Sequence, residues 1–217
     1  MTKLTIEKLI KEAAGFSRAE SRHTEKSLYG VTDGKAVGTY LEHKFKSHLR
    51  ETYTFEAGSS ASGIDFPELQ VDIKVTSITQ PQSSCPFKSA RQKIYGLGYS
   101  LLVFVYEKID KVSNKTATLR ILHTIFVESH RTADFLTTTG ILRILESGGN
   151  RDDVSGFILD RRLTVDEMEA KAITDEIFNV SFVQGFLTVS PPLQWAQYYD
   201  KVIEQAGQVE GIHKVIH

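Results

Sequence analysis

The sequence predicts an α/β fold in which a single domain is built on a central mixed β-sheet flanked by helices. Along its 217 residues, apolar positions recur at helical spacing in some segments and in short continuous or alternating runs in others. With 41% hydrophobic and 24% charged residues, the composition is that of an ordinary globular protein. The chain contains no repeat, no low-complexity tract and no linker long enough to separate two domains. Strands interspersed with helices in this way favour one mixed sheet.

The N-terminal part of the chain predicts two helices and a hairpin. Ile6, Leu9 and Ala13 form one stripe of a short amphipathic helix over residues 5–14. A polar loop with glycine breakers follows, and apolar residues then return at helical spacing. A Pro67-Glu68 turn joins the last two of three expected strands. The loop covers residues 17–35, the second helix 37–49, and the strands 52–56, 64–66 and 69–77.

The remaining elements are indicated by apolar runs, capping residues and turn residues. Thr164 followed by Glu167 has the pattern of a capping box, which predicts the start of a helix. Gly148 and Gly149 end the helix before it, and a polar turn at 110–114 separates two strands. In order, we expect a polar loop over 80–86, a basic helix over 87–95, strands over 101–106 and 116–127, helices over 132–146 and 164–178, a strand over 181–189 and a helix over 193–205.

Charge and cysteine content exclude several classes of protein. Lys+Arg 26 against Asp+Glu 27 argues against a protein that holds nucleic acid by bulk charge alone. The total conceals an asymmetry, because residues 1–150 hold 20 Lys+Arg and 16 Asp+Glu, whereas residues 151–217 hold 6 and 11. No apolar signal segment opens the chain, and its longest apolar run is too short to span a bilayer, so we expect a cytoplasmic protein with no membrane partner. The single cysteine, Cys85, excludes an internal disulfide.

Residues 63–76 carry the pattern that points to chemistry. Alternate side chains of a strand share a face, so Asp72, Lys74 and Thr76 are expected on one face and the Val and Ile residues between them on the other. A surface strand with its polar side chains in water would show the same alternation. The richness in Val and Ile indicates instead a central strand, whose polar face does not meet bulk water. Asp65 ends the preceding strand, within hairpin reach of Asp72.

Two carboxylates beside an ammonium group suit metal-assisted hydrolysis of a phosphodiester. Mg²⁺ prefers hard oxygen ligands, with one or two carboxylates completed by water and phosphate. The metal stabilises charge on the phosphorane, and a lysine can orient or deprotonate the attacking water. The pattern therefore indicates a nuclease.

These residues resemble the PD-(D/E)XK motif of type II restriction endonucleases and related DNA-cleaving enzymes. The resemblance implies that Asp65 and Asp72 are metal-binding carboxylates, that Lys74 is the catalytic lysine and that the backbone carbonyl of Ile73 is a further metal ligand. Family members often add a glutamate from the helix before the hairpin, and Glu42, at the edge of its helix's apolar stripe, fits that role.

The motif departs from the family pattern in two ways. The proline usually precedes the first aspartate, whereas here Pro67 follows it. The spacing of seven residues between the two aspartates is also short for the family, although a tight hairpin accommodates it. The resemblance extends over residues 37–106.

The resemblance implies a restriction-endonuclease-like fold and a defined reaction. We expect residues 1–217 to form a single nuclease domain, with a catalytic core over about 37–128 and a C-terminal region over 129–217 packed on it. The expected enzyme is a type II restriction endonuclease that uses Mg²⁺, with Mn²⁺ as a substitute. It would cut double-stranded DNA at a specific short sequence to give 5′-phosphate and 3′-hydroxyl ends.

The expected partners follow from the same reaction. A single active site per chain cuts both strands of a palindrome through two-fold symmetry, so a homodimer is expected. A cognate DNA methyltransferase is expected as a genetic rather than a bound partner.

Three other functions fit parts of the pattern. A repair or recombination nuclease of the same fold would recognise DNA structure rather than sequence. A non-cleaving DNA-binding module would keep the fold, but clustered carboxylates would only repel phosphate in such a protein. A sugar or nucleotide enzyme with structural aspartates would have no affinity for DNA.

The segment after the motif is expected to contact DNA. Residues 73–106 contain no Asp or Glu, and their basic side chains suit phosphates while their Gln and Ser side chains suit base edges. A solvated polar loop leading into a surface helix is the alternative interpretation. The predicted contacts are Ser77, Gln80, Gln82, Ser83, Ser84, Lys88, Arg91, Gln92 and Lys93.

Overall fold

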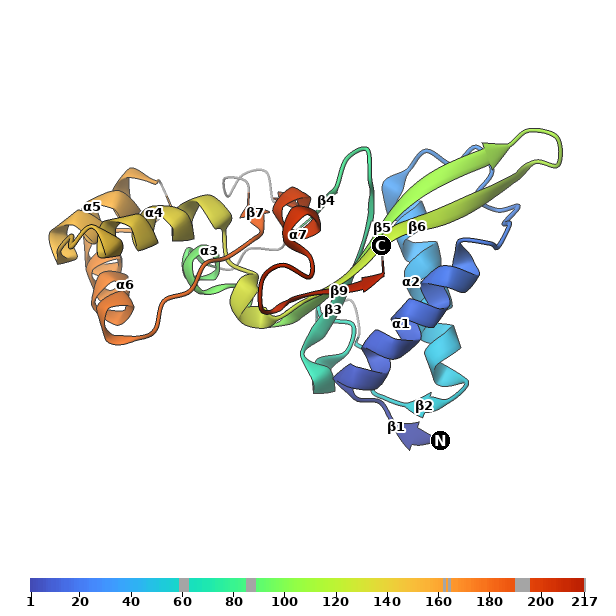
Figure 1. The fold of residues 1–217 in the computed structure, drawn as a ribbon, viewed down its shortest axis with the longest axis horizontal. Helices are drawn as coiled ribbons and strands as arrows, with labels where there is room; N and C mark the ends of the chain where they lie inside the picture. Colours follow the sequence, from blue (N-terminus) through green and yellow to red (C-terminus); the bar gives the residue numbers. More distant parts are fainter. Residues whose placement is uncertain (59–62, 85–88, 162, 164, 190–195, 217) are drawn as a thin grey trace.

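The chain forms an elongated molecule in which three helices lie at one end and a sheet packed against two helices lies at the other (Figure 1). This computed structural model describes residues 1–58, 63–84, 89–161, 163, 165–189 and 196–216. Within these residues, no helix is long and apolar enough to cross a membrane.

The central sheet has four strands in the order β3-β5-β6-β9. Strand β3 (Val71–Ser77) runs parallel to β5 (Ser100–Lys111), while β6 (Thr116–Val127) is antiparallel both to β5 and to β9 (Ile212–Ile216). The predicted α/β fold with a mixed sheet is therefore confirmed. The sequence did not predict β9, whose five residues alternate too weakly for a strand to be recognised.

Helices α1 (Ile6–Glu20) and α2 (Gly34–Arg50) cover one face of this sheet. Phe16, Phe45 and Phe104 pack together in the core between them, with ring centroids 5.0–6.1 Å apart. The predicted loop over 17–35 is wrong at its start, because α1 continues through Ser17 and Glu20. Both are buried but paired, Ser17 with Thr124 and Glu20 with Lys44, so their polarity concealed the helix.

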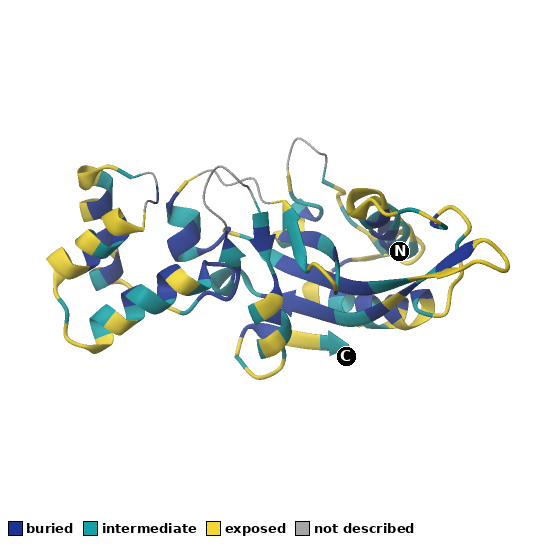
Figure 2. Ribbon diagram, turned by 90° about the horizontal axis from the view of Figure 1, so that it is seen from above, coloured by how far each residue is buried: buried dark blue, intermediate teal, exposed yellow. Residues whose placement is uncertain are grey.

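A second group of elements covers the opposite face of the sheet. It comprises a small sheet of order β4-β8-β7, from Gln82–Ser84, Ala196–Tyr198 and Thr188–Val189, and the helix α7 (Asp200–Gln205). Figure 2 shows the middle of β5 and β6 buried between the two groups. The predicted strand over 181–189 is reduced to β7, and the predicted helix over 193–205 begins only at Asp200, after strand β8.

Helices α4 (Phe135–Glu146), α5 (Arg151–Asp160) and α6 (Glu167–Asn179) form what we call the helical lobe. It has a core of its own, to which the short helix α3 (Arg91–Tyr95) contributes Ile94. Helix α5 was not predicted, although Asn150 and Asp153 form a capping box at its start. Of the predicted basic helix over 87–95, residues 87 and 88 lie outside the described residues, residues 89 and 90 are not helical, and α3 forms the rest.

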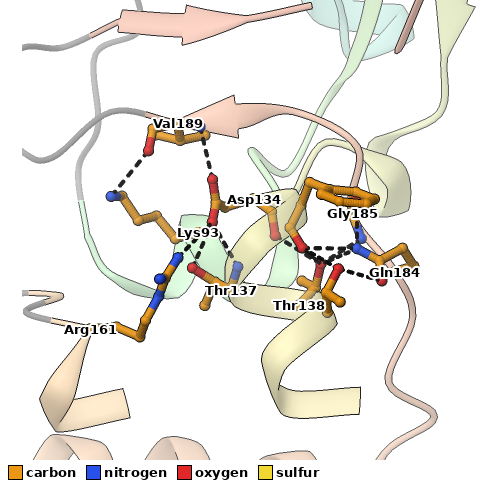
Figure 3. Close-up of polar contacts among 10 residues, drawn as sticks. Lys93, Asp134, Thr137, Thr138, Arg161, Gln184, Gly185 and Val189 are labelled. Atoms are coloured by element: carbon orange, nitrogen blue, oxygen red, sulfur yellow. Dashed lines mark hydrogen bonds and ion pairs between the residues drawn. The ribbon is translucent and has the colours of Figure 1, made fainter. Parts of the chain in front are cut away.

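Asp134, the N-cap of α4, joins the helical lobe to the rest of the protein (Figure 3). Its Oδ2 accepts hydrogen bonds from the backbone N–H and hydroxyl of Thr137 at 2.8 and 2.6 Å, and its Oδ1 accepts one from the N–H of Val189 at 2.8 Å. Arg161, which follows the last residue of α5, lies 3.9 Å from Oδ2, and Lys93 donates to the Val189 carbonyl at 3.4 Å. One buried carboxylate thus contacts α4, strand β7 and the end of α5.

A short two-stranded ladder and a 3₁₀ turn complete the fold. Strand β1 (Thr2–Lys3) pairs in parallel with β2 (Tyr53–Thr54), the only part of the predicted strand over 52–56 that forms a ladder in the described residues. The 3₁₀ turn η2 (Ser129–Arg131) leads from β6 toward α4.

Replacing Asp134 with alanine is expected to lower the free energy of unfolding by about 2–4 kcal/mol. Three donors, two of them backbone N–H groups, would lose their acceptor inside the protein. Urea denaturation of the metal-free protein measures the change. The control is Asp33→Ala, which removes the exposed N-cap of α2 and should cost about 1 kcal/mol or less. Equal losses in the two variants would contradict the role given to Asp134.

Candidate active site

A tight turn brings Asp65 beside strand β3. The chain reverses through the 3₁₀ turn η1 (Pro67–Leu69), and Gln70 closes it with a φ of 52°. Phe66 and Val71 form a single antiparallel bridge across the turn. The predicted strand over 64–66 is therefore wrong, since only Phe66 pairs; Pro67 initiates the turn, which explains why a proline follows Asp65.

The two predicted aspartates are in direct contact through the backbone. The N–H of Asp65 donates to Asp72 Oδ1 at 3.3 Å, and the N–H of Ile73 donates to Asp65 Oδ2 at 2.8 Å. The N–H and C=O of a strand residue point to the same side, so the carbonyl of Ile73 faces the edge on which Asp65 lies. Three of the predicted metal ligands thus meet at the edge of β3 that faces away from β5. The prediction of a central strand is wrong, because β3 is the first strand of the four-stranded sheet.

Lys74 lies beside Asp72 on the same strand, as the alternation predicted. Its Nζ is 2.8 Å from Asp72 Oδ2. Among the described residues, this buried oxygen accepts no hydrogen bond of good geometry. Asp72 is only 5% exposed, so its Oδ2 atom is kept out of water, with the Lys74 ammonium group close by.

Glu42 reaches the site through Lys46, a residue that the sequence analysis missed. Both lie on α2, one turn apart, and Lys46 Nζ donates to Glu42 Oε1 at 2.8 Å. The same ammonium group also donates to Asp65 Oδ1. Lys46 therefore bridges the helix carboxylate and the turn carboxylate. Its position four residues after Glu42 was the signal that could have revealed it, because such residues share a helix face.

Burial acts to raise the pKa of each of the three carboxyl groups in the site. It raises the pKa of Asp72 to about 6, although the neighbouring Lys74 opposes the shift. It likewise raises the pKa of Glu42, with Asp65 adding to the effect and Lys46 opposing it. Burial also acts to raise the pKa of Asp65, but hydrogen bonds from Lys46 and the Ile73 N–H outweigh it and lower the pKa overall.

The oxygen atoms of the site are the kind of ligand that a hard divalent cation prefers. Asp65, Asp72, Glu42 and the Ile73 carbonyl supply only oxygen, and one oxygen of Asp72 lacks a well-aligned hydrogen bond among the described residues. In the described part of the chain, no three acidic, histidine or cysteine side chains already stand in an arrangement that would hold a metal ion. The Lys46 ammonium group lies between Glu42 and Asp65 instead. The residues present fit Mg²⁺ in chemical type.

The residues predicted to contact DNA lie in two places. Ser77, Gln80, Gln82, Ser83 and Ser84 follow Lys74 along β3 and into β4, where Thr76 Oγ1 donates to the carbonyls of Gln80 and Gln82 at 3.2 and 3.0 Å. This segment is therefore held against the strand that carries the site.

The remaining predicted contacts lie on or next to α3. Arg91 forms an ion pair with Glu176 of α6, and Gln92 donates to the Leu97 carbonyl at 3.4 Å. Lys93 is buried, and burial lowers its pKa (Figure 3). Lys88, like Cys85, lies outside the described residues.

Replacing Asp72 with asparagine is expected to stabilise the metal-free protein above pH 6. A carboxyl whose pKa is raised from 3.8 to about 6 binds its proton more tightly in the folded state, so the wild-type protein loses stability as pH rises through that window. The variant removes this loss, and we expect a gain of about 1–3 kcal/mol at pH 8 and little change near pH 4.

Denaturant unfolding in EDTA at both pH values measures the difference. The control is Asp110→Asn, because Lys108 lowers the pKa of that exposed carboxyl and the expected effect at pH 8 has the opposite sign. A gain for Asp72→Asn that is equal at pH 4 and pH 8 would contradict the pKa assigned to Asp72.

Comparison with known proteins bears on the whole chain. The family model described as "Type II restriction enzyme NspV" matches residues 3–214. A curated protein named "Type II restriction enzyme NspV", from Nostoc sp. (strain ATCC 29411 / PCC 7524), is 65% identical over 212 residues, which cover 98% of this chain and 96% of that protein. No solved structure is significantly similar. The chain belongs to the NspV family of type II restriction enzymes, which confirms the prediction of a type II site-specific endonuclease.

Proposed function

We propose that the protein is a Mg²⁺-dependent restriction endonuclease that hydrolyses both strands of a specific short DNA sequence to 5′-phosphate and 3′-hydroxyl ends. The observation that supports it most is the meeting of Asp65, Asp72 and Lys74 at the outer edge of β3, with the Ile73 N–H fixing Asp65 in place. The relative from Nostoc carries the name of a type II restriction enzyme, in agreement with this reaction.

In the proposed mechanism, Asp65, Asp72, Glu42 and the carbonyl of Ile73 would hold the metal ion. When bound, Mg²⁺ would supply positive charge to the transition state of phosphodiester hydrolysis. Lys74 is placed to orient the attacking water by donating a hydrogen bond to it, because its ammonium group lies 2.8 Å from Asp72, a proposed metal ligand. Only the neutral amine form of Lys74 would accept the proton of that water. The turn through Pro67–Leu69 holds Asp65 at the level of Ile73, so the carboxylates are positioned before substrate arrives.

We propose that DNA lies along β3 and the segment that follows it. Ser77, Gln80, Gln82, Ser83 and Ser84 are the base-reading candidates, since Thr76 holds their backbone next to the strand that bears Lys74. Of the basic residues, Arg91, Lys88 and Lys93 stay candidates for phosphate contacts together with Gln92. Arg91 and Lys93 would first have to leave Glu176 and the Val189 carbonyl.

The proposal includes assembly and cellular context. We propose that the chain is a single nuclease domain with its catalytic core over about 37–128 and residues 129–217 packed on it. It would act as a homodimer, because one site per chain cuts two strands through two-fold symmetry. It would act in the cytoplasm beside a DNA methyltransferase that protects the host sequence.

Asp72→Asn and Lys74→Met are each expected to lower the rate of duplex cleavage by about 10³-fold, because each removes a group at the reacting centre. Single-turnover cleavage of a long duplex in Mg²⁺ and in EDTA measures the effect, and sequencing of discrete fragments gives the site and the ends. The control, Lys108→Met, alters a lysine on the β5–β6 hairpin that pairs with Asp110. Full activity of either site variant, or preferential cutting of branched DNA, would overturn the proposal.

A further inference from the structure

Lys46 occupies a position that the cleavage reaction does not explain. It is a lysine only 9% exposed, placed among the catalytic carboxylates rather than on the surface. Its ammonium group contacts Glu42 and Asp65, and no step of the proposed hydrolysis uses it. Burying an ammonium group costs free energy unless it pairs with an opposite charge. Glu42 and Asp65 provide that pairing for Lys46.

The charges of the site show what Lys46 does in the metal-free protein. Asp72 and Asp65 are mostly buried and Glu42 is partly buried, and the Lys74 ammonium group lies beside Asp72. Without Lys46, Glu42 and Asp65 would face each other as like charges with no cation between them. Lys46 therefore serves as the counter-ion of this pair.

The position of the Lys46 ammonium group conflicts with the expected role of Glu42 and Asp65 as metal ligands. A Mg²⁺ ion bound by both carboxylates needs their oxygens at about 2.0–2.1 Å, in the gap between them. The Lys46 ammonium group fills that gap and is itself positive, so it repels a second cation there. The ammonium group and the metal ion cannot both be bound by this pair of oxygens.

We propose that Lys46 is an internal counter-ion that competes with the divalent cation for Glu42 and Asp65 and must release them before the metal binds both. The inference rests on the proposed metal site. Its consequence is that Lys46 lowers the metal affinity of the DNA-free enzyme, and that metal binding exposes its ammonium group.

The first experiment measures Mn²⁺ binding to the DNA-free protein by isothermal titration calorimetry. Lys46→Met keeps an unbranched side chain on α2 and removes its charge. We therefore expect Mn²⁺ to bind this variant at least about tenfold more tightly than it binds the wild type. The matched control is Lys44→Met on the same helix, whose lysine pairs with Glu20 outside the site and whose removal should leave Mn²⁺ affinity unchanged.

The second experiment uses the wild-type chain, so it does not depend on the folding of a variant. Amine labelling followed by mass spectrometry compares the extent of labelling of Lys46 with that of Lys44 at increasing concentrations of Mn²⁺. We expect labelling of Lys46 to rise several-fold as the metal site fills, while that of Lys44 stays constant.

The outcomes separate this inference from the function on which it rests. If Mn²⁺ binds the wild type but binds Lys46→Met equally or more weakly, and labelling of Lys46 does not rise, the counter-ion role is overturned and the metal site stands. If neither protein binds Mn²⁺ at any concentration that saturates wild-type cleavage, both the metal site and the inference are overturned.

Discussion

The structure of the site is governed by the cost of keeping three carboxylates largely out of water beside one strand edge. Asp72 is the most affected, since burial raises its pKa to about 6 even with an ammonium group 2.8 Å away. The other two carboxylates share the ammonium group of Lys46. Asp65 receives a backbone N–H and an ammonium group, and Glu42 receives the ammonium group one helical turn away. Such a site can persist only in a scaffold that holds every compensating group in place.

The scaffold holds these groups in place because the sheet is packed between two layers. The aromatic cluster of Phe16, Phe45 and Phe104 fixes α2, and with it Glu42 and Lys46, against the sheet that carries Asp72. On the far side, a second apolar cluster and the small sheet hold the middle strands. The helical lobe has its own core and is joined to the rest of the protein through Asp134, away from the three carboxylates.

Much of this could be predicted from the sequence, and the failures have physical causes. Asp65, Asp72 and Lys74 were placed correctly relative to one another because a strand alternates its faces and a short turn limits where the chain can go. The end of α1 was missed because Ser17 and Glu20 are polar residues whose partners, Thr124 and Lys44, are far away in sequence. Strand β9 was missed for a related reason, because its pairing with β6 is set by tertiary contact rather than by a pattern of its own. Lys46 was overlooked because a lysine on a helix is normally solvated, and only the fold reveals that Asp65 lies above it.

The turn between Asp65 and Asp72 has a consequence for how this family can vary. The Phe66–Val71 bridge and the left-handed Gln70 fix the number of residues in the turn, and that number sets whether the Asp65 carboxylate meets the N–H of Ile73. One inserted or deleted residue would move Asp65 by about 3.3 Å along the strand, which is farther than a hydrogen bond tolerates. The length of the turn is therefore matched to the hydrogen bond between the Ile73 N–H and the Asp65 carboxylate.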